Sequence, residues 1–520
     1  MKFKLIVFFV SILSSFISLA QNHGTREDRE ALFDYILSKT EDREARSAIK
    51  EASFGIDVME EMESVRVEFL AAQNDTDLYY AIQKLSAKRK DRHLSVDVIE
   101  GGLVLPAIDK GQAPIRFYPD FGKDEIVFFV ADLGTNIDQA GKKPALGDIL
   151  VSVNGEPVLD YMNKVSEYTR FSTWNNFYVR FAYSLGLKSD NLPPSFFKED
   201  LTLTLKKNNG KTYEVTLPYM DEIEWKRGWV DKSYDGFKKV ETFNFDSFEL
   251  YVPTDKKNKT LLLWWYGFRG DLPDAADALV EYASVNDLLD YDLIIDAINS
   301  RGGSQGAYAL ARLTSVPFRT TGGNLKLSDI TSDFIAGYTD RYLSRKAIMD
   351  GEGRETEDDG TWAIDWLHGP VLKGLAAGQE YSNNTPFKCA HLPHYSDWMM
   401  APAEKHFTGK MVALFGPWGG SHLTQFSSML IDNQLAYTIG MPDGGYSNTW
   451  EWEEDLVFPT TEKPVVSFMW SIGHTVRPNG QVAEGNPPMV DEYIPVTQKN
   501  YFTYKTTLVE KALDWLKESK

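Results

Sequence analysis

A serine at the end of a glycine-rich turn, Ser421, could act as a nucleophile. The turn 416–421 reads Gly-Pro-Trp-Gly-Gly-Ser; it follows the apolar run 411–415 and opens a predicted helix over 422–432. Free N–H groups and the dipole at a helix N-terminus stabilise a developing oxyanion. Serine in such a position is more often only a helix cap. Ser421 therefore needs a neighbouring base before it can be read as catalytic.

A second glycine-containing turn follows another predicted strand. The predicted buried strand 291–296 is followed by Asn299, Ser300 and Arg301, then by Gly302 and Gly303, ahead of a predicted helix. Glycine allows a backbone N–H to approach a ligand closely.

A base is needed beside the serine. A serine hydroxyl is a weak nucleophile unless a neighbour takes its proton. Histidine can take it because its ordinary pKa lies near neutrality, and a carboxylate can fix the tautomer of that histidine. His422 is one candidate by position, although adjacent side chains on a helix diverge.

The two glycine-containing turns, with the strands and helices beside them, resemble those of the C-terminal-processing (tail-specific) serine peptidases. The resemblance is in particular to the tricorn-related branch of that family. The strand 436–440, the turn 441–445 and the closing segment 479–497 follow the family's order. The resemblance runs from His93 to the C-terminus, without the insertion 317–410. It implies a triad of Ser421, His93 in Asp91-Arg92-His93 and Glu484 in Ala483-Glu484-Gly485. It also implies an oxyanion hole formed by backbone N–H groups near Gly302, Gly303 and His422. Taken singly, His93 and Glu484 could be ordinary structural residues.

The sequence departs from the family's pattern in three places. The turn before Gly302 has fewer glycines than usual, and Val490 stands where the family has a proline before Asp491. One branch of the family uses a lysine base about 25 residues after the serine. Tyr446 occupies that position, and no lysine lies between Lys410 and Lys463. The Ser-His-Glu branch is the one that the resemblance implies.

The surrounding elements predict an α/β protein in several parts. Helical spacing over 26–39, 57–72 and 75–88 predicts an N-terminal helical region, 21–100, that carries His93. Strand patterns fill 101–225, where 145–158, with Leu146-Gly147-Asp148 and Val153-Asn154-Gly155, resembles a PDZ domain. Strands and helices alternate over 235–520. The resemblance implies a crotonase/ClpP-like spiral core there, and 317–410 reads as a long irregular insertion.

The N-terminus predicts export. Lys2 and Lys4 precede the apolar run 5–16, and Ser18-Leu19-Ala20 is a small-residue cleavage pattern, so 1–20 reads as a signal peptide. The apolar run is short for a membrane span of about 20 residues. We therefore expect a secreted or periplasmic protein without stable membrane insertion. A single cysteine, Cys389, excludes an intramolecular disulfide.

Composition narrows the possible ligands. A formal net charge of −20 argues against binding to nucleic acid, whose phosphates need a basic surface. Cys389, His391 and His394 are metal-ligand types at close spacing, but Pro393 breaks any helix there and no second ligand pair is evident. We therefore expect neither a metal nor another cofactor.

These observations predict a secreted serine endopeptidase that acts through an acyl-enzyme. Its partner would be a protein or peptide, which the PDZ-like region could bind by the C-terminal tail. Three alternatives stay open: an inactive peptide- or ligand-binding protein on the same scaffold, a hydrolase of non-peptide esters, and a metalloenzyme at Cys389, His391 and His394.

Overall fold

The structure is a computed structural model that describes residues 22–135, 137, 144–227, 234–351, 361–386, 398–447 and 450–519. The predicted signal peptide and the candidate metal ligands Cys389, His391 and His394 lie outside the described residues. Within the part of the chain that is described, no helix is both long and apolar enough to span a membrane.

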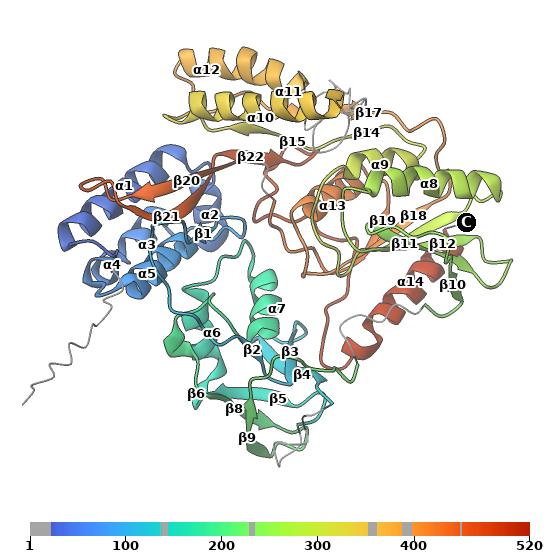
Figure 1. Cartoon of the computed structure of the whole chain (residues 1–520). Helices are drawn as coiled ribbons and strands as arrows, with labels where there is room; N and C mark the ends of the chain where they lie inside the picture. The colour runs from blue at the N-terminus through green and yellow to red at the C-terminus, as the bar shows by residue number, and fades with distance from the viewer. Residues whose placement is uncertain are drawn as a thin grey trace, which may run out of the picture.

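Five helices form the N-terminal body, shown in blue in Figure 1. Thr25 begins the first of them with a reciprocal capping box to Asp28. The predicted helix over 57–72 is two helices, because the chain turns at Ser64 and Val65. Strand β1 joins β20 and β21 from near the C-terminus in one antiparallel sheet, so distant parts of the chain share this body's core. The elements are α1 (Arg26–Arg43), α2 (Ser47–Phe54), α3 (Val58–Glu63), α4 (Arg66–Ala71), α5 (Asp75–Lys88), β1 (Val96–Asp97), β20 (Glu451–Val457) and β21 (Pro464–Ser471).

An antiparallel β domain follows, at the bottom of Figure 1. Its strands run in the order β3-β4-β5-β8-β9, and β6 pairs with β5. Asn154 and Gly155 make the turn between β5 and β6, both with positive φ (51° and 88°), as the Asn-Gly pair predicts. The elements are β2 (Gly111–Gln112), β3 (Ile115–Asp120), β4 (Val127–Leu133), β5 (Ile149–Val153), β6 (Glu156–Pro157), α6 (Val158–Ser166), α7 (Trp174–Ser184), β7 (Leu187–Lys188), β8 (Asp200–Lys206) and β9 (Thr212–Pro218).

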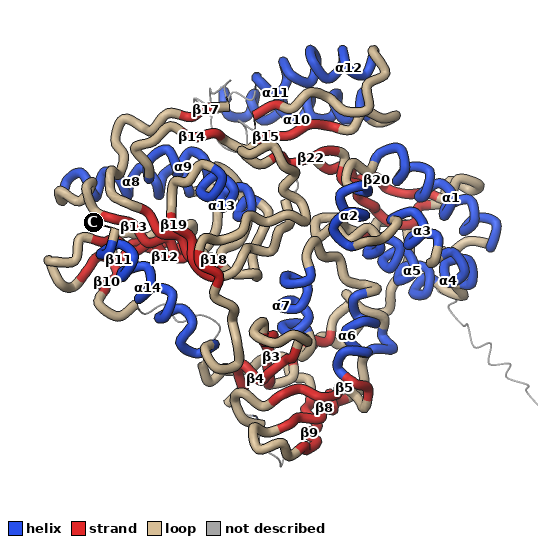
Figure 2. The backbone as a smooth tube through the Cα atoms, turned by 180° about the vertical axis from the view of Figure 1, so that it is seen from behind, coloured by secondary structure: helices blue, strands red, loops and turns tan. Residues whose placement is uncertain are grey.

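A seven-stranded sheet in the order β10-β11-β12-β13-β18-β19-β23 forms the third part. It is parallel from β12 to β23, and its strands are apolar on both faces because helices cover both (Figure 2). Helices α8, α9 and α13 pack on one face and α14 on the other. The elements are β10 (Phe237–Lys239), β11 (Phe248–Pro253), β12 (Thr260–Trp265), α8 (Leu272–Val285), β13 (Asp292–Asp296), α9 (Gly306–Leu313), β18 (Met411–Phe415), α13 (His422–Asp432), β19 (Tyr437–Gly440), β23 (Glu492–Tyr493) and α14 (Tyr504–Glu518).

The prediction that 317–410 is irregular was wrong. The described residues of this insertion, at the top of Figure 1, include three α-helices, the last two joined by a π-helical turn, and its strand β15 pairs with β22. Its apolar side chains are buried against Trp450 and the N-terminal body, a contact that local spacing does not reveal. The elements are β14 (Phe318–Arg319), β15 (Gly322–Leu325), α10 (Thr331–Gly351), α11 (Thr361–Trp366), α12 (Leu372–Ala376), β16 (Thr385–Pro386), β17 (Met399–Met400) and β22 (Gly473–Val476).

The topology of the large sheet positions the two glycine-rich turns. Strands β13 and β18 are parallel neighbours at its centre, with Asp296 opposite Leu414. Both turns leave the carboxyl ends of these strands, so Gly302 and Ser421 lie at the same edge of the sheet. This is the edge at which open α/β sheets bind ligands.

Candidate active site

Ser421 occupies a strained turn between β18 and α13. Its φ is 61° and its ψ is −123°, a conformation that side-chain-bearing residues rarely adopt. It precedes the first residue of α13, but its hydroxyl makes no capping hydrogen bond. Its backbone N–H donates instead to the carbonyl of Tyr446. The Ser421 hydroxyl is thus not used as a helix cap.

That hydroxyl meets His93 from the N-terminal body. The Nε2 atom of His93 lies 3.2 Å from Ser421 Oγ, although the two residues are 328 positions apart in the sequence. Burial lowers the pKa of His93 to about 4, against the opposing effect of Asp91 and Glu484. At neutral pH the imidazole is therefore uncharged and able to accept a proton.

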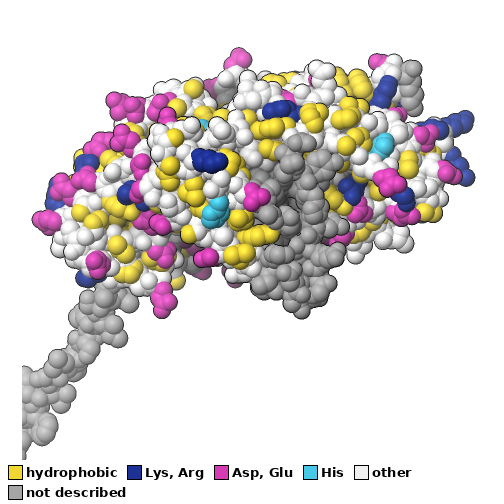
Figure 3. All heavy atoms as spheres, turned by 90° about the horizontal axis from the view of Figure 1, so that it is seen from above, with side chains coloured by type: hydrophobic (Ala, Val, Ile, Leu, Met, Phe, Trp, Pro, Cys, Tyr) yellow, Lys and Arg dark blue, Asp and Glu magenta, His cyan; other side chains and the backbone are white. Residues whose placement is uncertain are grey.

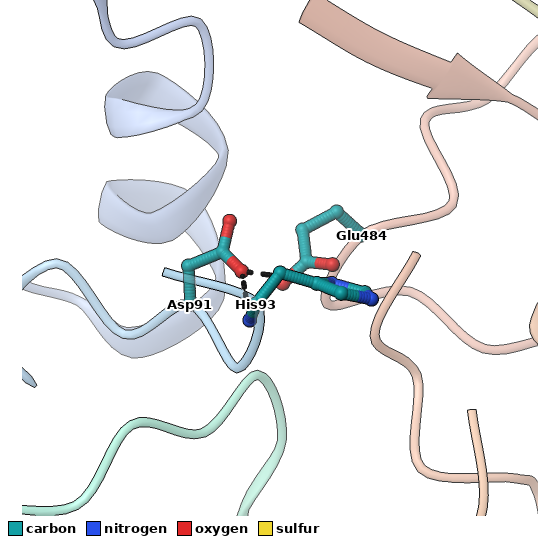
Figure 4. Close-up of side chains that lie close together, drawn as sticks. All are labelled: Asp91, His93 and Glu484. Carbon is teal, nitrogen blue, oxygen red and sulfur yellow. Dashed lines mark hydrogen bonds and ion pairs between the residues drawn. The ribbon is translucent and has the colours of Figure 1, made fainter. Parts of the chain in front are cut away.

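Asp91 and Glu484 lie behind the imidazole (Figure 4). A side-chain nitrogen of His93 and a carboxylate oxygen from each acid lie within 4.8 Å of one another. Asp91 Oδ1 is 3.9 Å from His93 Nδ1 and accepts a hydrogen bond from the His93 backbone N–H at 2.9 Å. No described residue accepts a hydrogen bond from Nδ1. The predicted Glu484–His93 pair is therefore a close approach without a direct hydrogen bond.

The reason is that other groups occupy the Glu484 carboxylate. Lys50 Nζ lies 2.6 Å from Oε1, while Oε2 accepts from the Ser447 N–H at 2.7 Å and lies 3.0 Å from Arg46. Arg46 also donates to Asp91 Oδ2 at 2.8 Å. All four charged side chains are buried. Burial works against ionisation of Asp91, but Arg46 and Lys50 outweigh it and hold the pKa of Asp91 well below its usual value.

The same cluster is a poor metal site. Two carboxylates and an imidazole at this separation have the residue types of a divalent-metal site. The carboxylates, however, are already neutralised by Arg46 and Lys50, and these buried cations would repel a metal ion. The arrangement instead fits an anionic support for an imidazole that gains a proton.

Gly302 lies beside the nucleophile, and Gly303 follows it in the same turn against Phe268; their role as oxyanion donors stays a prediction. A Cβ built on Gly302 would lie 2.5 Å from Ser421 Cβ and 3.0 Å from Ser421 Oγ, so only glycine fits there. Phe268 pairs with this turn through the Gly302 carbonyl and the Ser304 N–H. The N–H groups of Gly302 and Gly303 have no acceptor among the described residues. They are thus available to an oxyanion on a substrate.

His422 does not serve as the base in this geometry. Its ring Nε2 accepts a hydrogen bond from the Gly306 N–H at 2.7 Å, and its ring packs edge-on against Phe268. Burial lowers its pKa to about 3. The acceptor nitrogen is therefore engaged at the start of α9, while His93 faces the serine.

Helix α7 of the β domain holds the nucleophile turn in place. Asn176 Nδ2 donates to the carbonyls of Pro417 and Trp418 at 2.9 and 3.0 Å, and Thr173 Oγ1 donates to the Gly444 carbonyl at 2.9 Å. All three parts of the chain therefore meet at the site.

The chain is similar to known proteins in its fold, and not detectably in its sequence. No family model matches the chain, and no curated protein matches it by sequence. Solved structures do match. The structure of mature CPAF complexed with lactacystin aligns with a TM-score of 0.69 and 16% identity, over 95% of this chain and 100% of that chain. The chain has the fold of mature CPAF.

A second crystal structure of mature CPAF aligns with a TM-score of 0.64 and 18% identity, over 94% of this chain and 96% of that chain. The photosystem II D1 C-terminal processing protease aligns with a TM-score of 0.41 and 11% identity, over 90% of this chain and 93% of that chain. The CPAF fold spans almost the whole chain. The predicted α/β class is confirmed, and the predicted resemblance is confirmed as a likeness of fold.

Several residues around the site were not predicted from the sequence: Arg46, Lys50, Asn176, Arg180 and Tyr446. The spacing of Arg46 and Lys50 puts both on one face of a short helix, which normally indicates a solvated surface. In the sequence, Tyr446 only marks the position at which one branch of the family has its lysine base. Its ring lies 5.3 Å from that of His93, and its carbonyl accepts from Ser421.

Proposed function

We propose that this protein is a serine endopeptidase that cleaves peptide bonds through an acyl-enzyme on Ser421. The observation that carries the proposal is the 3.2 Å approach of His93 Nε2 to Ser421 Oγ. A nucleophile and a base within hydrogen-bond reach, with acids behind the base, are the parts that acyl transfer needs. The shared fold with mature CPAF, captured with lactacystin, supports it.

The first step is attack on the substrate. His93 Nε2 takes the Ser421 proton while Oγ forms a bond to the carbonyl carbon. The carbonyl π electrons move onto oxygen, where the N–H groups of Gly302 and Gly303 can hold the negative charge. The N–H of His422, at the first turn of α13, is a further candidate donor.

The second step returns the proton to the leaving amine. His93 is then an imidazolium, and its positive charge is stabilised by the carboxylates of Asp91, 3.9 Å away, and Glu484, within 4.8 Å. Arg46 and Lys50 keep these carboxylates ionised and fixed in place. Water activated by His93 then hydrolyses the ester, and Ser421 is released.

Labelling with a fluorophosphonate probe tests this proposal. We expect the parent protein to be labelled, Ser421→Ala to take up no label, and His93→Ala to lose at least about 100-fold in labelling rate. His368→Ala is the control, because His368 is an exposed residue of the insertion whose ring forms a hydrogen bond with Thr339. A parent that takes up no label would favour a binding protein, and full labelling of His93→Ala would remove His93 as the base.

Cleavage tests with peptide and ester substrates distinguish a peptidase from a hydrolase of non-peptide esters. A peptidase should cleave unstructured peptides, with each product mass reporting a broken amide bond. Cleavage of esters alone, with intact peptides, would contradict the proposal.

We also propose export, with cleavage after Ala20, and action on substrates outside the cytoplasm. The basic start, the apolar run and the small residues 18–20 support it. N-terminal sequencing of the protein from its natural source should then begin at Gln21.

A further inference from the structure

Three arginines gather beside His93 without a carboxylate partner. Arg92 precedes His93 in the chain, Arg170 donates to the Leu94 carbonyl, and Arg180 lies on α7. None of the three forms an ion pair with a described residue. Some buried arginines elsewhere pair with acids, as Arg89 does with Glu44 and Arg477 with Asp432.

The Tyr446 side chain lies between Arg180 and His93. Its Nη2 donates to the Tyr446 hydroxyl at 3.1 Å, and its Nε donates to Asn176 Oδ1 at 3.0 Å. The guanidinium lies 5.3 Å from the centre of the Trp418 ring and 5.6 Å from that of Tyr446. The Tyr446 ring contacts the His93 ring. Its hydrogen bonds fix the orientation of Arg180 and leave part of the fork open.

The charge of Arg92 also interacts with the Tyr446 phenol. Its backbone N–H donates to Ser172 Oγ at 3.1 Å, which fixes the segment 91–93 against the start of α7. Its side chain is partly buried and makes no hydrogen bond with a described residue. Burial, together with the nearby charge of Arg180, lowers the pKa of Arg92 to about 10. Its positive charge is therefore held at a cost that a bound anion would offset.

A shortage of acids does not explain the missing partners. The chain has a net charge of −20, and acidic side chains are spread over the face seen in Figure 3. The three arginines therefore place positive charge beside the His93 segment of a protein that is acidic as a whole. An arginine fork binds a carboxylate with two parallel hydrogen bonds, and the affinity is higher where water is partly excluded.

We propose that Arg92 and Arg180 form a subsite for a substrate carboxylate next to Ser421. This inference rests on the proposed peptidase function and adds a substrate class to it: peptides that carry a carboxylate close to the scissile bond. The carboxylate can come from an acidic side chain or from a free C-terminus.

Matched peptides distinguish these sources. One series carries Glu or Gln at each position flanking the scissile bond, and another carries a C-terminal acid or amide at varied distance from it. We expect the parent to prefer the carboxylate form by about 10- to 100-fold in kcat/KM at one position. A preference in the first series identifies an acidic side chain, and one in the second identifies the C-terminus.

Substitution of the arginines assigns the subsite. Arg92→Gln and Arg180→Gln should each reduce the preference at least about 5-fold, mainly through KM, because the lost contact is made in the ground state as well. Arg92→Glu should favour Lys over Glu at that position. Each preference is a ratio within one variant, so a partial loss of folded protein does not alter it. Arg26→Gln, which removes an exposed arginine far from the site, should keep the parent's preference.

Two results would overturn the inference: equal cleavage of carboxylate and amide peptides by the parent, or a full preference retained in both Gln variants. Either result leaves the peptidase proposal standing, because peptides are still cleaved. A parent that neither takes up the fluorophosphonate nor cleaves any peptide would instead overturn the proposed function, and with it the subsite.

Discussion

At the scale of single residues, the site is a neutral imidazole between a serine hydroxyl and a charged cluster. His93 is kept uncharged by burial, and the two acids behind it are balanced by Arg46 and Lys50. Without these cations, two buried carboxylates would repel each other and favour protonation. The cluster therefore lets Asp91 and Glu484 remain anionic next to the base.

The pKa of His93 predicts the acid limit of the reaction. Only the uncharged imidazole can accept the serine proton, and its pKa of about 4 means that this form persists well below neutrality. We expect the rate of fluorophosphonate labelling to be level from about pH 7 down to pH 5 and to fall tenfold per unit below about pH 4. A midpoint near pH 6.5 would show that the folded protein leaves this pKa unshifted. Asp91, Glu484, Arg46 and Arg92 are the charged groups that act on it.

The charged cluster predicts a strong coupling between Glu484 and Lys50. Glu484→Gln leaves Lys50 buried without its anion, and we expect it to lower the free energy of unfolding by about 3–5 kcal/mol. Lys50→Met should do the same, and the double variant should lose less than the sum of the two. Urea unfolding measures all three.

An exposed ion pair is the matched control for this cycle. Glu63→Gln removes a partner of Arg66 on the surface and should change the free energy of unfolding by less than about 1 kcal/mol. Additive losses for Glu484→Gln and Lys50→Met would contradict the coupling.

At the scale of elements, the site is assembled from strand ends, a helix start and a neighbouring domain. The order of β13 and β18 brings the two glycine-rich turns together, and α7 fixes one of them from outside the sheet. Each element has a separable role, which allows each to be tested alone.

Asn176 is expected to transmit the position of α7 to the nucleophile. Asn176→Ala removes two hydrogen bonds and leaves two carbonyls of the turn without their donor, so labelling should slow by about 10-fold or more, with about 2–3 kcal/mol lost in stability. Asn175→Ala is the control, since Asn175 is its neighbour on the same helix and makes no such bond to the turn. Equal labelling of the two variants would show that α7 does not position the turn.

Gly302 is expected to be indispensable for reaction. The methyl group of Gly302→Ala would press on Ser421 Cβ and displace the hydroxyl or the oxyanion donor, so labelling should fall by about 100-fold. Gly270→Ala, where a methyl group meets no neighbour within 4 Å, should label as the parent does. A labelled Gly302→Ala would mean that the turn can move aside.

Much of this fold could be predicted from periodicity, but the charged cluster could not. The strand 261–266 and the helices 26–39 and 75–88 have regular apolar spacing, and each forms within a few residues of its predicted bounds. The insertion was predicted as irregular because its apolar side chains are buried by distant partners such as Trp450. Lys50 likewise gave no local sign of burial, since its partner Glu484 is 434 residues away.

The candidate site was predicted in part. The positions of Ser421, His93 and Gly302 follow from motifs that the resemblance connects, and the structure brings these three residues together. The role of Glu484 stays a prediction. Its carboxylate contacts Lys50 and Arg46 directly, but it only approaches His93, within 4.8 Å and without a hydrogen bond. Which carboxylate supports an imidazole depends on sub-ångström placement, which residue order alone does not encode.

At the scale of the whole molecule, buried histidines predict instability in acid. Burial lowers the pKa of His93 and His474 to about 4 and that of His422 to about 3, so the unfolded chain binds protons below about pH 6.5 that the folded protein refuses. Glu44, whose pKa burial raises to about 7, opposes one of them. We expect the free energy of unfolding to fall by about 2 kcal/mol per unit between pH 6 and pH 5. Urea midpoints measured across this range test it, and a constant midpoint would contradict it.

The separation of His93, Ser421 and Glu484 along the chain has a consequence for the cell that makes this protein. A ribosome has produced the base long before the nucleophile, which lies 328 residues later, and Glu484 follows after that. A growing or truncated chain that stops before residue 421 lacks Ser421. The three side chains can therefore come together only once nearly the whole chain has been synthesised.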